Sequence, residues 1–113
     1  MKNHFELGKE GEKLAAKFLK KQGFFVLEKN LRLPQCEIDI ICTDKKVLRF
    51  VEVKTRSSTE FANPREAVDF KRRQNYRRAG EFYVKINNLQ NVPLHFDIIE
   101  VVGKEITYLP DDF

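Results

Sequence analysis

The sequence of 113 residues has no Trp, two Cys, four Pro and five Gly. So little Pro and Gly excludes a low-complexity linker, and two Cys are too few for a disulfide scaffold. Cys36 and Cys42 lie in a segment expected to be extended. This would place them ~20 Å apart, whereas a disulfide requires Cα atoms within ~7 Å of each other. We therefore expect free thiols and a reducing compartment.

Long hydrophobic runs are also missing. Near the N-terminus the longest apolar run covers residues 24–27, which is far too short for a secretory signal or a membrane-spanning segment. We therefore expect a cytoplasmic protein that has no membrane partner.

The composition is that of a folded domain. Hydrophobic residues make up 42% of the chain, which excludes a disordered tail, and the length suits a single domain over residues 1–113. Ten Phe residues suggest a core filled with phenylalanine. The net charge of +4 and the pI of about 9.1 are a weak indication of a polyanionic partner.

The apolar pattern predicts an α/β chain with one central sheet. Leu7, Leu14 and Phe18 recur at helical spacing in a first helix, and Tyr83 and Ile86 share the stripe of a second. In chain order we expect a helix at 4–22, strands at 24–27, 37–42 and 47–53, a helix at 64–87, and strands at 94–102 and 105–109. The order is α-β-β-β-α-β-β, with longer loops at 30–35 and 57–63.

The hairpin expected around residues 45–46 carries charged residues among apolar ones. With the turn at these two residues, the numbers of opposed residues sum to about 91. Asp39 then lies opposite Glu52, and Glu37 lies opposite Lys54. Because side chains alternate across a strand, these four residues would share one face. The other face would carry Ile38, Ile40, Cys42, Val51 and Val53.

Asp39 and Glu52 would be two carboxylates forced together in a partly buried site, where they repel each other. A cation relieves that repulsion, and carboxylate oxygens suit Mg²⁺ or Mn²⁺. Lys54 would project beside the metal, where it could orient a water and stabilise charge on a phosphate. This combination suits cleavage of phosphodiester bonds. The plainer alternative is a cross-strand salt bridge between Glu37 and Lys54, with Asp39 as a cap.

Further charged residues occur in both helices. Glu12 follows two helical glycines, Gly8 and Gly11, each of which costs ~1 kcal/mol relative to Ala. Close approach of the helix to the sheet or to a phosphate would explain them, while a solvated Glu12 is the alternative. Lys71 and Arg72 lie beside or within the stripe of the second helix, which predicts a groove for a phosphate backbone rather than a solvated face.

Two polar residues near the strand at 94–102 have ordinary explanations. His95 is expected to be a structural or surface residue. Asp97 lies among apolar neighbours and could pair with a basic residue such as Arg32.

Several of these residues fall in recognisable motifs. The motifs are Gly8-x-x-Gly11-Glu12, Asn30-x-Arg32, Glu37-Ile38-Asp39-Ile40-Ile41, Phe50-Val51-Glu52-Val53-Lys54-Thr55-Arg56, Pro64-x-Glu66-Ala67-Val68, Lys71, Phe96-Asp97 and Phe113. They span nearly the whole chain and resemble the YraN-like family of small bacterial proteins. That family belongs to the PD-(D/E)XK nuclease superfamily and is related to Holliday-junction resolvases. The chain departs from the family pattern at Cys36, Ala62 and His95.

The resemblance implies a restriction-endonuclease-like core, in which a mixed central sheet of about five strands is flanked by helices. It also implies that Asp39 and Glu52 bind Mg²⁺ or Mn²⁺, that Lys54 is the catalytic lysine, and that Glu12 reaches the same metal site. The accessory residues would be Glu37 and Lys71. The cations expected to contact nucleic acid are Lys71, Arg72, Arg56 and Arg32.

These inferences favour a metal-dependent endonuclease acting on DNA, including branched or structured DNA. A nucleic-acid-binding protein with a silent or regulatory nuclease-like site is the alternative, motivated by the basic second helix and by His95. An interaction protein whose charged cluster is purely structural is a third option. By analogy with resolvases, the partner would include a second copy of the chain in a homodimer.

Overall fold

A computed structural model describes residues 4–44, 46–56 and 70–113 of the chain. The elements follow one another as α1 (His4–Lys21), β1 (Phe25–Arg32), β2 (Glu37–Thr43), β3 (Leu48–Arg56), α2 (Phe70–Ile86), β4 (Leu94–Val102) and β5 (Glu105–Leu109). The predicted order α-β-β-β-α-β-β is confirmed, and so is the mixed α/β class.

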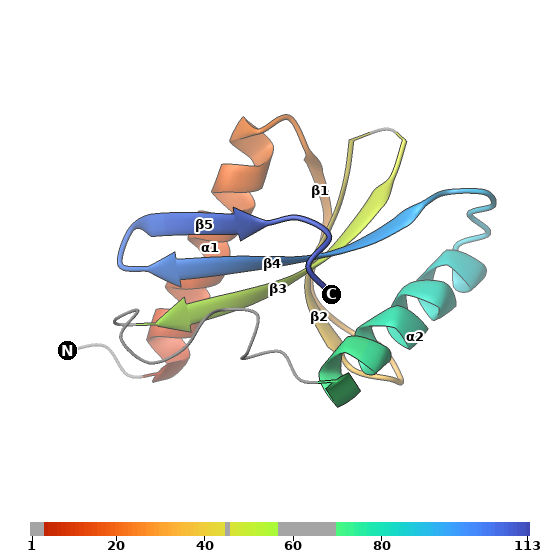
Figure 1. The fold of residues 1–113 in the computed structure, drawn as a ribbon, viewed down its shortest axis with the longest axis horizontal. Helices are drawn as coiled ribbons and strands as arrows, with labels where there is room; N and C mark the ends of the chain where they lie inside the picture. The colour runs from red at the N-terminus through yellow and green to blue at the C-terminus, as the bar shows by residue number, and fades with distance from the viewer. Residues whose placement is uncertain (1–3, 45, 57–69) are drawn as a thin grey trace.

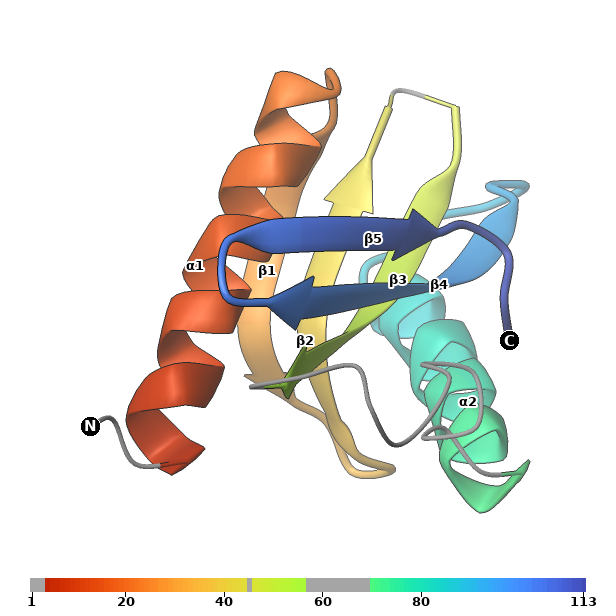
Figure 2. The same cartoon turned by 60° about the vertical axis from the view of Figure 1, so that its left-hand side comes forward.

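The five strands form one mixed sheet in the order β1-β2-β3-β4-β5. β3 and β4 pair in parallel, whereas the other neighbouring strands pair antiparallel. A parallel pair needs a long crossover connection, and α2 lies within it. Figure 1 shows the sheet with its helices, and in Figure 2 α1 and α2 lie on opposite sides of it.

One half of the core lies between the sheet and α1. Small residues of α1, Ala15 and Ala16, are buried together with Leu19 against Ile40 and Val51 of the sheet. Alanine has no side chain beyond Cβ, so this face of the helix can approach the strands closely. The amphipathic stripe predicted for the first helix is therefore confirmed.

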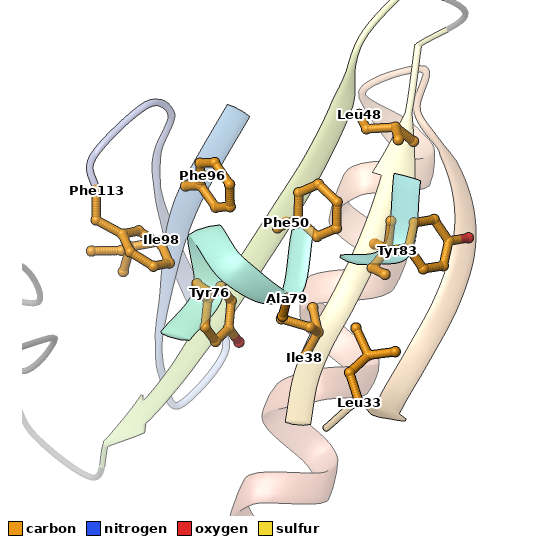
Figure 3. Close-up of a cluster of buried hydrophobic side chains, with 11 residues drawn as sticks. Leu33, Ile38, Leu48, Phe50, Tyr76, Ala79, Tyr83, Phe96, Ile98 and Phe113 are labelled. Carbon is orange, nitrogen blue, oxygen red and sulfur yellow. The ribbon is translucent and has the colours of Figure 1, made fainter. Parts of the chain in front are cut away.

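The other half of the core lies between the sheet and α2 (Figure 3). Tyr76 and Tyr83 of α2 pack with Phe50 and Phe96 of the sheet. A Cβ built on Gly80 would lie 3.2 Å from Phe96 Cζ, so the helix backbone lies close to the sheet there. Aliphatic and tyrosine side chains fill much of this core, so the expectation of a phenylalanine core holds for part of it. The buried Phe residues of the described part are Phe50, Phe96 and Phe113.

β1 is longer than predicted. The sequence pattern predicts a strand at 24–27 and a loop from residue 30, but β1 continues to Arg32. The pairing with β2 shifts by one residue between Val26 and Glu28, and Asn30 has a left-handed backbone with φ of 51°. Both irregularities interrupt the alternation of apolar and polar residues, which explains why the pattern predicted an early end.

The other element bounds agree well with the prediction, with two differences. β3 extends to Arg56 because its parallel pairing with β4 continues to the pair of Arg56 and Val102. Ile86, expected in the stripe of the second helix, is 54% exposed at the last residue of α2. The predicted helix start at 64 and the polar loop at 57–63 lie outside the described residues. Cys36 and Cys42 are free thiols, as expected.

No helix in the described part of the chain is long and apolar enough to cross a membrane.

Candidate active site

The predicted hairpin register is confirmed up to the edge of the site. Four pairs between β2 and β3 have numbers that sum to 91, from Thr43 with Leu48 to Ile40 with Val51. The described pairing ends there, one residue before Asp39 would meet Glu52. Asp39 instead turns its carboxylate into the ladder, where Oδ2 accepts the backbone N–H of Val53 at 2.8 Å.

The strand changes face at Asp39. Ile38 and Ile40 were expected on one face, but Ile38 packs in the core beside α2 and Ile40 packs in the core beside α1. The prediction was wrong because it assumed regular alternation. In β1, the left-handed Asn30 lies between the partners of Ile38 and Ile40, and this kink breaks the alternation locally. Asp39 is therefore placed where β2 and β3 separate.

Glu52 is held by cations from two elements. The carboxylate is 4% exposed, and its Oε2 accepts hydrogen bonds from Arg72 Nη2 at 2.9 Å and Nε at 3.2 Å. Its Oε1 lies 3.3 Å from Lys54 Nζ. Arg72 comes from α2, where its guanidinium also lies over the ring of Tyr76. Glu52 is thus neutralised on both oxygens.

The environment of Asp39 opposes ionisation. Burial, followed by the nearby charge of Glu52, raises the pKa of Asp39 to about 7, and the carboxylate of Glu12 adds to this effect. The N–H of Val53 lowers the pKa, but by less than the raising causes together. A carboxyl group with such a pKa would gain free energy from a cation placed beside it.

Gly11 brings Glu12 to this site. A Cβ at residue 11 would lie 1.9 Å from Thr55 Oγ1, so α1 crosses β3 at a distance that a glycine alone permits. The close approach expected for the helical glycines is confirmed for Gly11. At Gly8 a Cβ would meet nothing within 4 Å, so the same explanation does not apply there.

The residues of this site lie within the match to a known protein family. The uncharacterised protein family UPF0102 matches residues 11–101. The chain belongs to the UPF0102 family. It is 42% identical over 113 residues to a UPF0102 protein of Clostridioides difficile, covering 98% of this chain and 99% of that protein. It is 42% identical over 104 residues to a UPF0102 protein of Bacteroides thetaiotaomicron, covering 92% of this chain and 85% of that protein. The resemblance to the YraN-like family is thereby confirmed.

Some predicted partners are different in this UPF0102 chain. Glu37 was expected opposite Lys54, either as an accessory acid or in a salt bridge, but it pairs with Arg32 of β1 at 3.6 Å. The expectation that Asp97 pairs with a basic residue is confirmed, but the partner is Arg49 and not Arg32. Asp97 is fully buried and accepts hydrogen bonds from Arg49 at 3.1 Å and from the Tyr108 hydroxyl at 2.6 Å.

The residues expected to bind nucleic acid are largely engaged with acids. Arg72 is bound to Glu52, Arg32 lies beside Glu37, and Arg56 Nε lies 3.4 Å from Glu100 Oε2. Lys71 is exposed near the start of α2. Of the four cations expected to contact nucleic acid, three therefore form ion pairs within the protein, and Lys71 is exposed.

The donor set of this UPF0102 site fits a hard divalent cation in its chemistry. Asp39, Glu52 and Glu12 supply carboxylate oxygens, and the charges of Glu52 and Glu12 add to burial in raising the pKa of Asp39. Within residues 4–44, 46–56 and 70–113, no three acids, His or Cys are arranged to hold a metal ion. Glu52 would have to give up contacts with Arg72 or Lys54 to become a ligand.

Tyr76 of the site, and Glu100 as the partner of Arg56, were not predicted from the sequence. The Tyr76 hydroxyl accepts the N–H of Asp39 at 3.3 Å, and interaction with Asp39 and Glu52 adds to burial in raising the pKa of Tyr76. Its spacing of three and seven residues from Ala79 and Tyr83 could have placed it on the buried stripe. Glu100 lies in an apolar strand with no sequence signal for its partner Arg56.

Proposed function

We propose that this UPF0102 protein is a metal-dependent endonuclease that cleaves phosphodiester bonds in DNA. The observation that carries the proposal is the position of Asp39 where β2 and β3 separate, with Glu52 and Lys54 following on β3. Carboxylates and a lysine at a break in the sheet can bind a cation and a phosphate together.

Asp39, Glu52 and Glu12 would hold Mg²⁺ or Mn²⁺. The bound ion would supply a water of lowered pKa and would neutralise charge on the phosphate. Asp39 is oriented for this role by the Val53 N–H, which fixes one oxygen of its carboxylate. Glu12 is brought within electrostatic reach of Asp39 by the close contact of Gly11 with Thr55.

Lys54 would act on the phosphate. Its ammonium is half-buried beside Glu52, so its charge is less screened than that of a surface lysine. Donors fixed before the reaction stabilise developing negative charge without further reorganisation. Lys54 can therefore stabilise the additional charge of the pentavalent phosphate and orient the attacking water.

Nuclease activity is tested by incubating the protein with supercoiled, linear and four-way-junction DNA in Mn²⁺ or Mg²⁺. We expect cleavage by the wild type, strongest on the junction, and at least a 100-fold loss in Asp39→Asn and Lys54→Ala. Glu105→Gln is the matched control, because Glu105 is an exposed acid at the start of β5. Cleavage that persists in Asp39→Asn would come from a contaminant and would contradict the proposal.

The contacts of Glu52 favour a second candidate, a nucleic-acid-binding protein whose nuclease-like site is silent or regulatory. Arg72 and Lys54 already occupy both oxygens of Glu52, as a cation would. Arg72→Gln separates the two functions. If the site binds metal, removing Arg72 frees Glu52, and Mn²⁺ should raise the melting temperature of Arg72→Gln by several degrees more than that of the wild type. Arg78→Gln, an exposed residue of the same helix, is the control. Equal responses to Mn²⁺ would favour the silent site.

A further inference from the structure

A surface pocket of about 230 Å³ lies between α1 and β1. Helix α1 lies on the opposite side of the sheet from α2 (Figure 2). Its lining consists of Lys9, Glu12, Lys13, Lys29 and Asn30. Three lysines and one glutamate give this small hollow a surplus of positive charge. Such a hollow suits an anion of the size of a phosphate group.

The lysines of α1 continue beyond the pocket. Lys9, Lys13 and Lys17 are spaced four residues apart, and Lys20 follows on the same side, so they form a row along one face of the helix. All four are exposed. The cations of this row are about 6 Å apart along the helix. A row with this spacing suits the successive phosphates of a nucleic-acid strand better than it suits one isolated anion.

Two of the pocket lysines are uncommitted to acids. Among the residues that the structure describes, Lys13 and Lys29 form no ion pair. Arg72, Arg56 and Arg32, by contrast, have carboxylate partners. On the α1 side of the sheet, a phosphate can therefore bind to lysines without first breaking an ion pair.

The kink in β1 shapes the pocket. Asn30 has a left-handed backbone with φ of 51°, and it lies at the exposed edge of the sheet beside Lys29. The kink interrupts the regular edge and places an amide side chain next to a lysine. An amide and an ammonium can donate hydrogen bonds to the same phosphate.

Glu12 connects the pocket to the candidate active site. It lines the pocket, and its charge also raises the pKa of Asp39. A strand whose phosphate occupied the pocket would therefore pass Glu12, and Asp39 lies within the electrostatic reach of Glu12. The pocket therefore places the approach of the strand on the α1 side of the sheet, while Glu52 lies on the α2 side with its partner Arg72.

We propose that the pocket between α1 and β1 binds a backbone phosphate of the nucleic-acid strand, with Lys13 and Lys29 as its principal contacts. This inference rests on the proposed nuclease function and adds to it the side of the molecule on which the strand lies. The lysine row of α1 continues the contact along the strand. The occupant is a phosphodiester backbone and not an acidic protein segment. The pocket has room for one phosphate group, and the spacing of the lysine row fits the phosphates that follow it along the strand.

The test measures binding of a fluorescent 20-nucleotide single-stranded DNA to the full chain in EDTA, where no cleavage occurs. The variant is Lys13→Gln/Lys29→Gln. Its matched control is Lys46→Gln/Lys85→Gln, which removes the same charge at the hairpin turn and at the far end of α2. At 0.1 M salt we expect the dissociation constant of the pocket variant to rise roughly 20-fold, with the slope of log K against log salt reduced by about 1.4. The control should change several-fold less.

Each outcome has a defined meaning. Equal weakening by the pocket variant and its control would overturn the inference, because general charge would then explain binding. Competition by poly-glutamate as effective as competition by unlabelled DNA at equal charge would overturn it too, by indicating an acidic protein partner. Pocket-dependent binding without metal-dependent cleavage would support the pocket and contradict the proposed nuclease. Cleavage with unchanged binding in the pocket variant would do the reverse.

Discussion

The carboxyl group of Asp39 carries an electrostatic cost that the fold does not remove. Its pKa is raised to about 7 from a usual value of 3.8, mainly through burial and the charge of Glu52. Between these two values the unfolded chain releases its proton while the folded chain keeps it. The free energy of unfolding should therefore fall as pH rises from about 4 to 7, by at most roughly 4 kcal/mol from this group.

Asp39→Asn should remove this part of the pH dependence. Asn keeps an oxygen that can accept the Val53 N–H but cannot ionise. We expect the variant to melt at a higher temperature than the wild type at pH 8 and at a similar temperature near pH 4. Thermal unfolding followed by circular dichroism measures this, with Glu105→Gln as the exposed control. A wild type that gained stability relative to Asp39→Asn between pH 4 and 7 would show that Asp39 is stabilised as an anion.

The sequence was enough to predict which residues form the candidate site, but not which side chains they contact. Asp39, Glu52 and Lys54 could be singled out because charged residues stood in otherwise apolar strands. The partners of Glu52 could not be predicted, because Arg72 comes from a helix whose position over the sheet depends on tertiary packing. The Tyr76 hydroxyl was missed for the same reason, since a buried tyrosine is indistinguishable in sequence from ordinary core.

Helix α1 offers a matched pair of glycines. Gly11→Ala would place Cβ 1.9 Å from Thr55 Oγ1, so the helix must move away from β3, whereas Gly8→Ala meets open space. We expect Gly11→Ala to lower the free energy of unfolding by about 2 kcal/mol or more. Gly8→Ala should raise it by up to about 1 kcal/mol through helix propensity.

Urea denaturation of both glycine variants checks this prediction. Because both changes add the same methyl group to the same helix, propensity cancels in their comparison. Stabilisation of similar size in the two variants would mean that α1 does not need its close contact with β3. Gly11→Ala should also reduce any Mn²⁺ response, since it moves Glu12 away from Asp39.

Elements were predictable where their pattern was regular. The hairpin register was correct because turn length and alternation together determine it. The face on which Ile38 packs was predicted wrongly, because the left-handed Asn30 in the neighbouring strand changes the alternation. The backbone angle of a polar residue in a strand could not be predicted from the sequence. The length of β1 was underestimated for the same local reason.

At the scale of the whole molecule, the part of the chain that the structure describes carries one candidate site on a single sheet, whereas a four-way junction presents two equivalent strands. If the proposed nuclease acts on junctions, two copies of the chain should bind one junction. Sedimentation of the inactive Asp39→Asn protein with junction DNA should therefore show a complex whose mass exceeds that of the free junction by two chains of 13.4 kDa each. Saturation at one chain per junction would contradict a paired mode of action.

The parallel pairing of β3 with β4 also has a consequence for how the chain is made. Leu48 pairs with Leu94, whereas β1, β2 and β3 are joined by short connections. Short loops close at a smaller entropic cost, so the three-stranded meander can pair during synthesis before β4 has been translated. For that interval β3 is an unprotected edge, and such edges recruit strands from other chains. Glu52, Lys54 and Arg56, the charged residues of one face of β3, would then discourage mispairing between nascent chains before they serve any substrate.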